Sequence, residues 1–289
     1  MSAAAPTERR LDVGWGELAA LEAGDPNGPQ LLCLHGWMDN AASFQPLTEQ
    51  LPEAHWVALD YAGHGRSDHR PGAQRYYFTD YLFDLDAALD ALGWDRCTLV
   101  GHSLGTALAA CYACADPQRV DRVVMIDGLG VITEDPRHAA QRLTKSLYSV
   151  RHPRDHRSVF ESIELAARAR QLKNPMADHS ARLLAERALR PVEDGYRWRT
   201  DPGAMWDSPY WMSEEHSTNI LQGIKCPVLA IVTPILERYL GERQPFRLAA
   251  MDDATVLELD GGHHLHMDEP ERLVDALRAF LFDEDLQHD

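Results

Sequence analysis

Residues 101–105 read Gly-His-Ser-Leu-Gly, and this pentapeptide constrains the fold more than any other stretch of the chain. It matches Gly-x-Ser-x-Gly, in which a serine sits on a strained turn between a β-strand and an α-helix. A short β-prone run over 97–100 precedes it, and a helix-forming run of small residues over 106–112 follows. Side chains on the two glycines would crowd so tight a turn. The pattern therefore predicts a reactive serine at Ser103, with an ordinary glycine-rich turn as the alternative.

Composition narrows the class of protein. A chain of 289 residues, 45% of them hydrophobic, suits one α/β core with an insertion. The 28 basic and 45 acidic residues give a net charge of −17, which argues against nucleic acid or an anionic membrane as a partner. Five cysteines without paired spacing predict reduced thiols. Because residues 1–10 contain no apolar signal core and no apolar run is long enough to span a bilayer, we expect a soluble cytoplasmic protein. Nothing in the sequence indicates its oligomeric state.

Strands and helices alternate through the first half of the chain. Strands are predicted over 31–34, 55–60, 97–100, 122–127, 226–232 and 255–259. Their order demands right-handed crossovers and a mostly parallel sheet. From about residue 128 to 219 the strand rhythm stops, and helical stretches punctuated by prolines take its place. We therefore predict an α/β core formed by 1–127 and 220–289, interrupted by a helical cap over 128–219.

A serine hydroxyl needs donors that hold the oxyanion and a base that takes its proton. His35-Gly36-Trp37 follows the first predicted core strand, and the glycine lets the backbone approach a substrate. The backbone amides of Trp37 and Leu104 are therefore the predicted oxyanion donors. A plain strand-to-loop turn is the alternative interpretation of His-Gly-Trp.

The best source of a base is residues 261–266, which read Gly-Gly-His-His-Leu-His directly after the last predicted strand. The glycine pair gives a loop that can carry an imidazole across the top of the sheet. Three histidines so close together also suggest a metal site. However, His263 and His264 are adjacent, and His263 and His266 have no carboxylate or cysteine at a familiar metal-ligand spacing. We predict that this stretch supplies a base and binds no metal.

Taken together, these motifs resemble those of the α/β-hydrolase superfamily over nearly the whole chain. The matching pieces are His35-Gly36-Trp37, residues 59–68, residues 101–105, and Gly262-His263 with Asp268 and Pro270 downstream. Four motifs in the family's order are far more specific than any one of them. Within the superfamily, the chain resembles the capped esterase and epoxide-hydrolase-like branch, and especially the group called serine hydrolase-like proteins.

This resemblance implies a mostly parallel eight-stranded sheet with a helical cap inserted after the sixth strand. It also implies a Ser–His–acid mechanism without a metal or an organic cofactor. In the family motif the catalytic histidine lies a fixed distance before a Pro-containing helix start, which favours His263 over His264 and His266. Relatives that open epoxides or remove halides carry aspartate where this chain has Ser103, so the serine points to acyl transfer.

The acid departs from the usual family pattern. It commonly follows the strand that here covers 228–232, in a Gly-x-x-Asp sequence, but residues 233–237 read Thr-Pro-Ile-Leu-Glu. Some relatives place the acid after the preceding core strand, where this chain has Asp127. We predict Asp127 as the acid. A structural aspartate that caps the turn at Gly128, with Glu237 as the acid instead, is the alternative.

The sequence thus predicts a cofactor-free serine hydrolase acting on an ester of a small or medium acyl group. Ser103 is the expected nucleophile, His263 the base and Asp127 the orienting acid. The predicted pocket residues are His35, His102, Trp198, Trp206 and Trp211. Hydrolysis of a thioester, a lactone or a carbon–carbon bond by the same triad is the first alternative. A catalytically silent fold that serves as a binding protein is the second.

Overall fold

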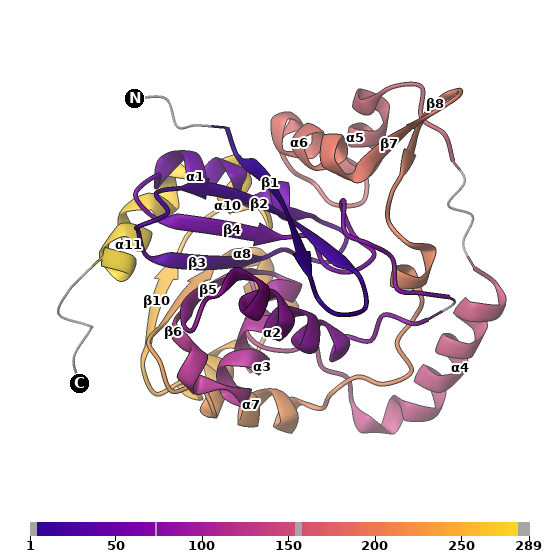
Figure 1. Ribbon diagram of the computed structural model, residues 1–289. Coiled ribbons are helices and arrows are strands. Elements are labelled where there is room, and N and C mark those ends of the chain that lie inside the picture. Colours follow the sequence, from indigo (N-terminus) through magenta and orange to yellow (C-terminus); the bar gives the residue numbers. More distant parts are fainter. Residues whose placement is uncertain (1–4, 73, 154–157, 283–289) are drawn as a thin grey trace.

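The computed structural model describes residues 5–72, 74–153 and 158–282. An eight-stranded sheet runs through it in the order β1-β2-β4-β3-β5-β6-β9-β10 (Figure 1). β1 and β2 pair antiparallel, as do β2 and β4, and the other neighbours are parallel. The strands are β1 (Thr7–Asp12), β2 (Glu17–Gly24), β3 (Gln30–Leu34), β4 (His55–Leu59), β5 (Cys97–His102), β6 (Val120–Ile126), β9 (Val228–Val232) and β10 (Ala254–Glu258). The expected mostly parallel eight-stranded sheet is therefore confirmed.

The inner parallel strands are apolar runs because both faces of the sheet are covered there, whereas no residue of the edge strand β10 is buried. Every residue of β4, β5 and β9 is buried. The sequences of the antiparallel strands β1 and β2, at one edge of the sheet, do not by themselves indicate strands. β2 is rich in alanine, leucine and glutamate, which are helix formers, yet it pairs with β4 through partners such as Ala20 and Leu59. Here the sheet context overrides the local preference.

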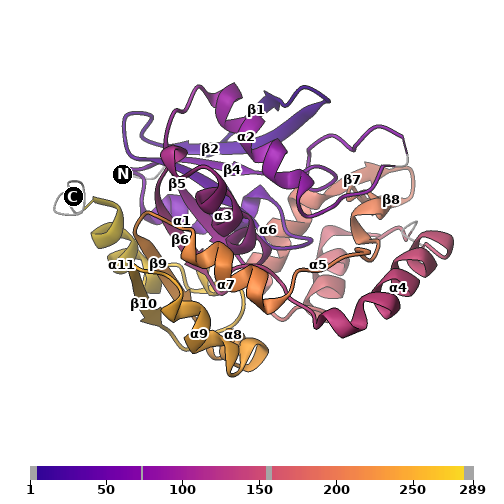
Figure 2. The ribbon, with the colours of Figure 1, turned by 90° about the horizontal axis from the view of Figure 1, so that it is seen from below.

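Two groups of helices sandwich the sheet. One face packs against α1 (Gln45–Gln50), α10 (Leu265–Asp268) and α11 (Glu271–Phe282). The other face packs against α2 (Asp80–Leu92), α3 (Leu104–Ala115), α7 (Glu214–Gln222), α8 (Pro234–Leu240) and α9 (Arg243–Ala249). In Figure 2, α3 and α7 lie side by side in front of the sheet. The apolar core therefore fills both faces.

The segment between β6 and α7 is the one that the sequence predicts to be a cap, and it is called the cap below. It contains α4 (Ala139–Arg151), α5 (Ile163–Gln171), α6 (Asp178–Ala188) and the hairpin of β7 (Leu189–Val192) and β8 (Gly195–Trp198). α5, α6 and the hairpin share a small apolar cluster, whereas α4 stands apart from them in Figure 1. α7 packs on α3, so the predicted cap boundary at residue 219 falls inside a helix that covers the sheet.

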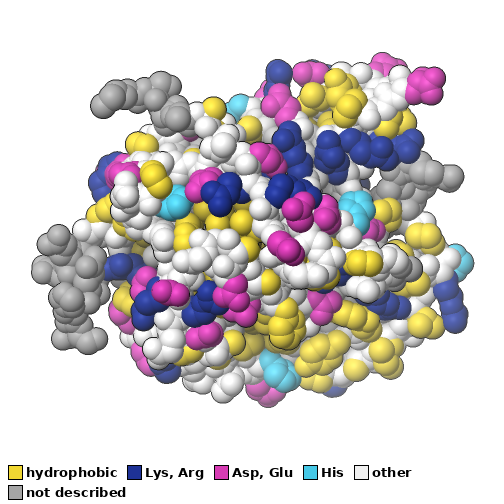
Figure 3. Space-filling view, viewed as in Figure 1, with side chains coloured by type: hydrophobic (Ala, Val, Ile, Leu, Met, Phe, Trp, Pro, Cys, Tyr) yellow, Lys and Arg dark blue, Asp and Glu magenta, His cyan; other side chains and the backbone are white. Residues whose placement is uncertain are grey.

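α4 carries three large apolar side chains that are exposed, Leu143, Leu147 and Tyr148. Apolar side chains gather over this part of the molecule in Figure 3.

Among the helices that the structure describes, none has the length and apolarity needed to cross a bilayer. All five cysteines are free, and Cys33, Cys97 and Cys111 are buried.

Backbone strain marks the carboxyl edge of the parallel strands. Within the described residues, three non-glycine residues have positive φ: Met38 at 64°, Ser103 at 51° and Asp127 at 46°. Ser103 and Asp127 directly follow β5 and β6, and Met38 lies in the loop after β3. Side chains rarely adopt this region, and such strain tends to cluster at functional sites. The edge where these three strands end is therefore the place to look for a site.

Candidate active site

Ser103 occupies the turn between β5 and α3, with φ 51° and ψ −114°. Its amide donates to the carbonyl of Ile126 at 3.0 Å, which ties the turn to the neighbouring strand. Its own carbonyl accepts from the amide and the hydroxyl of Thr106, at 3.0 and 2.7 Å. These bonds hold the serine in a conformation that an isolated chain would avoid. The turn therefore has the local geometry that the sequence predicted.

The two glycines of the pentapeptide are sterically required. A Cβ on Gly101 would lie 2.5 Å from the backbone of Gly105. A Cβ on Gly105 would lie 1.8 Å from the carbonyl oxygen of Leu34 in β3. Both distances are far below van der Waals contact, so only glycine lets α3 start this close to the sheet.

Asp127 and His263, predicted from distant parts of the sequence, are brought together. Nδ1 of His263 donates to Oδ2 of Asp127 at 2.5 Å, a short charge-assisted hydrogen bond. The Asp127 side chain is 1% exposed and that of His263 is 26% exposed. The bond places the imidazole proton on Nδ1 and leaves Nε2 as the basic nitrogen. Nε2 makes no hydrogen bond to any described residue, so it is free to accept a proton.

Thr233, which the sequence analysis did not single out, completes the surroundings of the carboxylate. Its hydroxyl donates to Oδ1 of Asp127 at 2.7 Å and its amide does so at 3.3 Å. The Asp127 amide in turn donates to the carbonyl of Ile231 in β9 at 2.8 Å. Glu237 is exposed on α8. The strand that usually carries the acid here supplies a hydrogen-bond donor to it instead, and the only sequence signal was a threonine directly after β9.

An apolar cavity of about 410 Å³ borders both predicted oxyanion donors. Its lining includes Trp37 and Leu104 from the core, and Trp206, Tyr210, Trp211 and Met212 from the chain before α7. Trp37 is 53% exposed, and its indole nitrogen donates to the carbonyl of Ala204 at 3.4 Å. The cavity therefore lies between the nucleophile turn and the cap.

Of the five predicted pocket residues, Trp206 and Trp211 line this cavity and three do not. Trp198 packs edge-to-face on Phe160, 5.6 Å between ring centroids, within the cap's own cluster. His35 is fully buried, where its Nδ1 donates to the carbonyl of Gly36 and its Nε2 accepts from the amide of Tyr61. Burial, together with nearby His64, lowers the pKa of His35 to about 3. His35 thus holds the loop after β3 as a neutral imidazole.

His102, the third of these, is buried beneath the nucleophile turn. Its Nε2 donates to the backbone carbonyl of His263 at 2.8 Å, which ties the residue before Ser103 to the base loop. Burial lowers the pKa of His102 to about 4, against the opposing effect of Asp39. His102 is therefore a neutral structural link and not part of the cavity wall.

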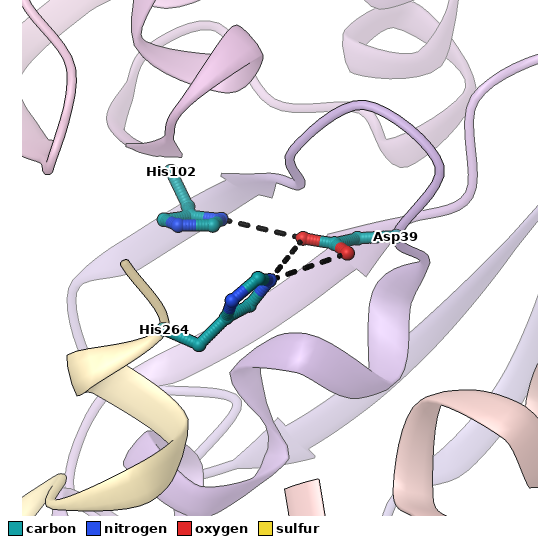
Figure 4. A group of neighbouring side chains, drawn as sticks. All are labelled: Asp39, His102 and His264. Atoms are coloured by element: carbon teal, nitrogen blue, oxygen red, sulfur yellow. Dashed lines mark hydrogen bonds and ion pairs between the residues drawn. The ribbon is translucent and has the colours of Figure 1, made fainter. Parts of the chain in front are cut away.

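A second group of side chains, which the sequence analysis missed, lies directly beside this link. Asp39, His102 and His264 are buried, and one potential metal-ligating atom from each lies within 4.8 Å of the others (Figure 4). The donor set alone would suit a transition metal. However, Arg170 of α5 forms an ion pair with the same Asp39 carboxylate. A divalent ion there would face this guanidinium, so the surroundings do not fit a metal.

Comparisons with known proteins agree with this architecture. A family model described as alpha/beta hydrolase fold matches residues 29–225. A serine hydrolase-like protein of Danio rerio is 29% identical, with 96% of this chain and 89% of the relative aligned. The structure of a hypothetical protein from Pseudomonas aeruginosa PAO1 is 35% identical and has a TM-score of 0.87, covering 97% of this chain and 99% of that one. The thioesterase domain from the curacin biosynthetic pathway is 25% identical and has a TM-score of 0.84, covering 95% and 99%.

Proposed function

This chain belongs to the α/β-hydrolase fold family, and we propose that it is a serine hydrolase that cleaves carboxylic esters through an acyl-enzyme on Ser103. The observation that carries the proposal is the 2.5 Å hydrogen bond between His263 and buried Asp127. The backbone carbonyl of His263 also accepts a hydrogen bond from His102, the residue before the strained serine. An oriented base together with a half-buried serine on a tight turn is what nucleophilic acyl transfer requires.

In the proposed reaction, Nε2 of His263 takes the hydroxyl proton as the Ser103 oxygen attacks the ester carbonyl carbon. Asp127 stabilises the imidazolium that forms. The amides of Trp37 and Leu104 donate to the oxyanion of the tetrahedral intermediate. When this intermediate collapses, His263 gives the proton to the departing alcohol. Water then repeats the sequence on the acyl-enzyme and releases the acid.

The cavity lining supports an apolar acyl group as the substrate's recognition element. Its walls are mostly aromatic and aliphatic, which favours burial of hydrocarbon by the hydrophobic effect. A thioester is the second candidate substrate, favoured by the likeness to the curacin thioesterase domain. The same nucleophile, base and oxyanion donors serve both bonds, so the leaving group alone separates the two.

A panel of acyl chains from acetyl to dodecanoyl tests the proposal, with each acyl group offered both as an ester and as a matched thioester. We expect hydrolysis of esters, and we expect Trp206→Ala and Trp211→Ala to change the ranking of the acyl chains, because both side chains line the cavity. Trp198→Ala is the matched control, since Trp198 packs inside the cap. An equal fall for every chain in the two cavity variants would show that these tryptophans only support the fold.

We expect Asp127→Asn to lower ester turnover by about 10⁴-fold while the protein stays folded, because an amide favours the wrong imidazole tautomer. Glu237→Gln is the control, since Glu237 is exposed on α8. Steady-state kinetics on one reactive ester give the comparison. A fully active Asp127→Asn together with an inactive Glu237→Gln would transfer the role of the acid to α8.

A further inference from the structure

The loop after β3 has a buried ionic attachment to the cap. Arg170, near the end of α5, donates from Nη1 to the carbonyl oxygen of Met38 at 2.7 Å and from Nη2 to the Asp39 carboxylate. The Arg170 side chain is 11% exposed and that of Asp39 is 2% exposed. Met38 is one of the three strained residues, and it directly follows Trp37, the predicted oxyanion donor. The cap therefore contacts the backbone next to the proposed oxyanion hole.

The same carboxylate reaches the two other loops of the site. Oδ2 of Asp39 lies 3.2 Å from Nε2 of His264 and 3.4 Å from Nδ1 of His102, as Figure 4 shows. His264 follows the proposed base and His102 precedes the proposed nucleophile. Burial alone would raise the pKa of Asp39, but His264 and Arg170 hold it well below its usual range, so the carboxylate is charged. The buried Asp39 carboxylate thus lies beside the residue that follows the proposed base and the residue that precedes the proposed nucleophile, and it belongs to the loop that carries Trp37.

We propose that Arg170 and Asp39 are positioning residues that fix residues 36–39, here called the oxyanion loop, so that the Trp37 amide points at the developing oxyanion. This inference rests on the proposed serine hydrolase function. A strained backbone such as that at Met38 persists only where its surroundings over-determine it. The Arg170 guanidinium supplies that constraint, because it donates both to the carbonyl oxygen of Met38 and to the side chain of the next residue, Asp39. α5 is then part of the catalytic apparatus and not a freely opening lid.

A second cap arginine provides a matched control. Arg187 of α6 is 5% exposed and donates to the buried Asp60 carboxylate at 2.9 and 3.0 Å and to Glu8. It resembles Arg170 in chemistry, burial and origin in the cap, but it makes no hydrogen bond to Met38 or Asp39. Loss of Arg187 therefore removes an ion pair between the cap and the core, and it leaves the hydrogen bonds from Arg170 to the oxyanion loop in place.

The experiment compares Arg170→Gln, Arg170→Lys and Arg187→Gln with the wild type. It measures kcat and KM on one ester, the rate constant for covalent labelling by a fluorophosphonate, and the melting temperature. We expect Arg170→Gln to lower kcat and the labelling rate by about 10²-fold, with KM changed by less than about threefold, because a misplaced donor weakens transition-state binding. Arg170→Lys keeps the charge but cannot grip both acceptors, so it should fall between Arg170→Gln and the wild type. Arg187→Gln should lower the melting temperature and change kcat by less than about threefold, since it leaves the oxyanion donors in place.

The possible results test the serine hydrolase proposal and the positioning role of Arg170 separately. Absence of labelling in the wild type would overturn the serine hydrolase proposal itself. A labelled wild type with unchanged kcat in Arg170→Gln would overturn the positioning role alone. Equal losses of kcat in Arg170→Gln and Arg187→Gln would reduce Arg170 to a structural role. If Arg170→Gln does not fold, Arg170→Lys decides, because a change in its KM without a change in kcat contradicts the proposal.

Discussion

We expect Ser103→Ala to lower ester turnover by about 10⁶-fold, to the level left by the oxyanion donors and substrate binding, because removal of the nucleophile closes the acyl-enzyme route. The variant should fold normally. Alanine lacks only the hydroxyl oxygen, and the strained turn is held through the Ser103 backbone. The measurement is the initial rate on the best ester of the acyl panel, with circular dichroism and melting temperature as checks on folding.

Ser208→Ala is the matched control for this experiment, because Ser208 lines the cavity from the cap side and its hydroxyl bonds only within its own loop, to Tyr210. Its turnover should stay within about threefold of the wild type, because the Ser208 hydroxyl takes no part in the proposed reaction. Full activity in Ser103→Ala would leave the fold without its proposed nucleophile. Absence of ester turnover in the wild type would instead favour the alternative of a silent hydrolase fold that binds a partner or ligand.

We expect His263→Ala to cause a loss of similar size, about 10⁶-fold, because base and nucleophile act as one unit and removal of either disables both. Its effect should not add to that of Ser103→Ala in the double variant. The ring nitrogens of His266 have no hydrogen-bond partner among the described residues, so His266→Leu, of similar volume, is the control within the same histidine-rich stretch.

Treatment with EDTA separates this mechanism from a metal-dependent one. The account of His263 as a base predicts that the chelator leaves turnover unchanged. Reversible inactivation by EDTA, restored by added zinc, would show that the cluster of Asp39, His102 and His264 holds an ion despite the neighbouring guanidinium.

The parts of the site that sequence alone indicated are those set by local sterics or by strand order. Gly101 and Gly105 indicate the turn in the sequence, because a side chain at either position would clash with neighbouring backbone. Asp127 was predictable as the residue that ends a strand next to the nucleophile strand, since parallel strands bring their carboxyl ends to one edge. The inner strands of the sheet followed from buried apolar runs, whereas the composition of β1 and β2 resembles that of helices.

The parts that sequence did not indicate depend on contacts between distant residues. Arg170 meets Asp39 across 131 positions and Thr233 meets Asp127 across 106, and neither pair has a local pattern. The aromatic cap residues show a similar limit. Their presence indicates apolar packing, but only the folded cap directs Trp206 to the cavity and Trp198 to the cap interior.

Mapping the site of covalent modification by a fluorophosphonate is the most direct test that Ser103 is an activated nucleophile. After labelling, the intact mass should rise by one adduct, and peptide mass spectrometry should place that adduct on Ser103. Ser103→Ala should show no increase in mass under the same conditions. An unmodified wild-type protein, or an adduct on any other residue, would contradict the proposed mechanism.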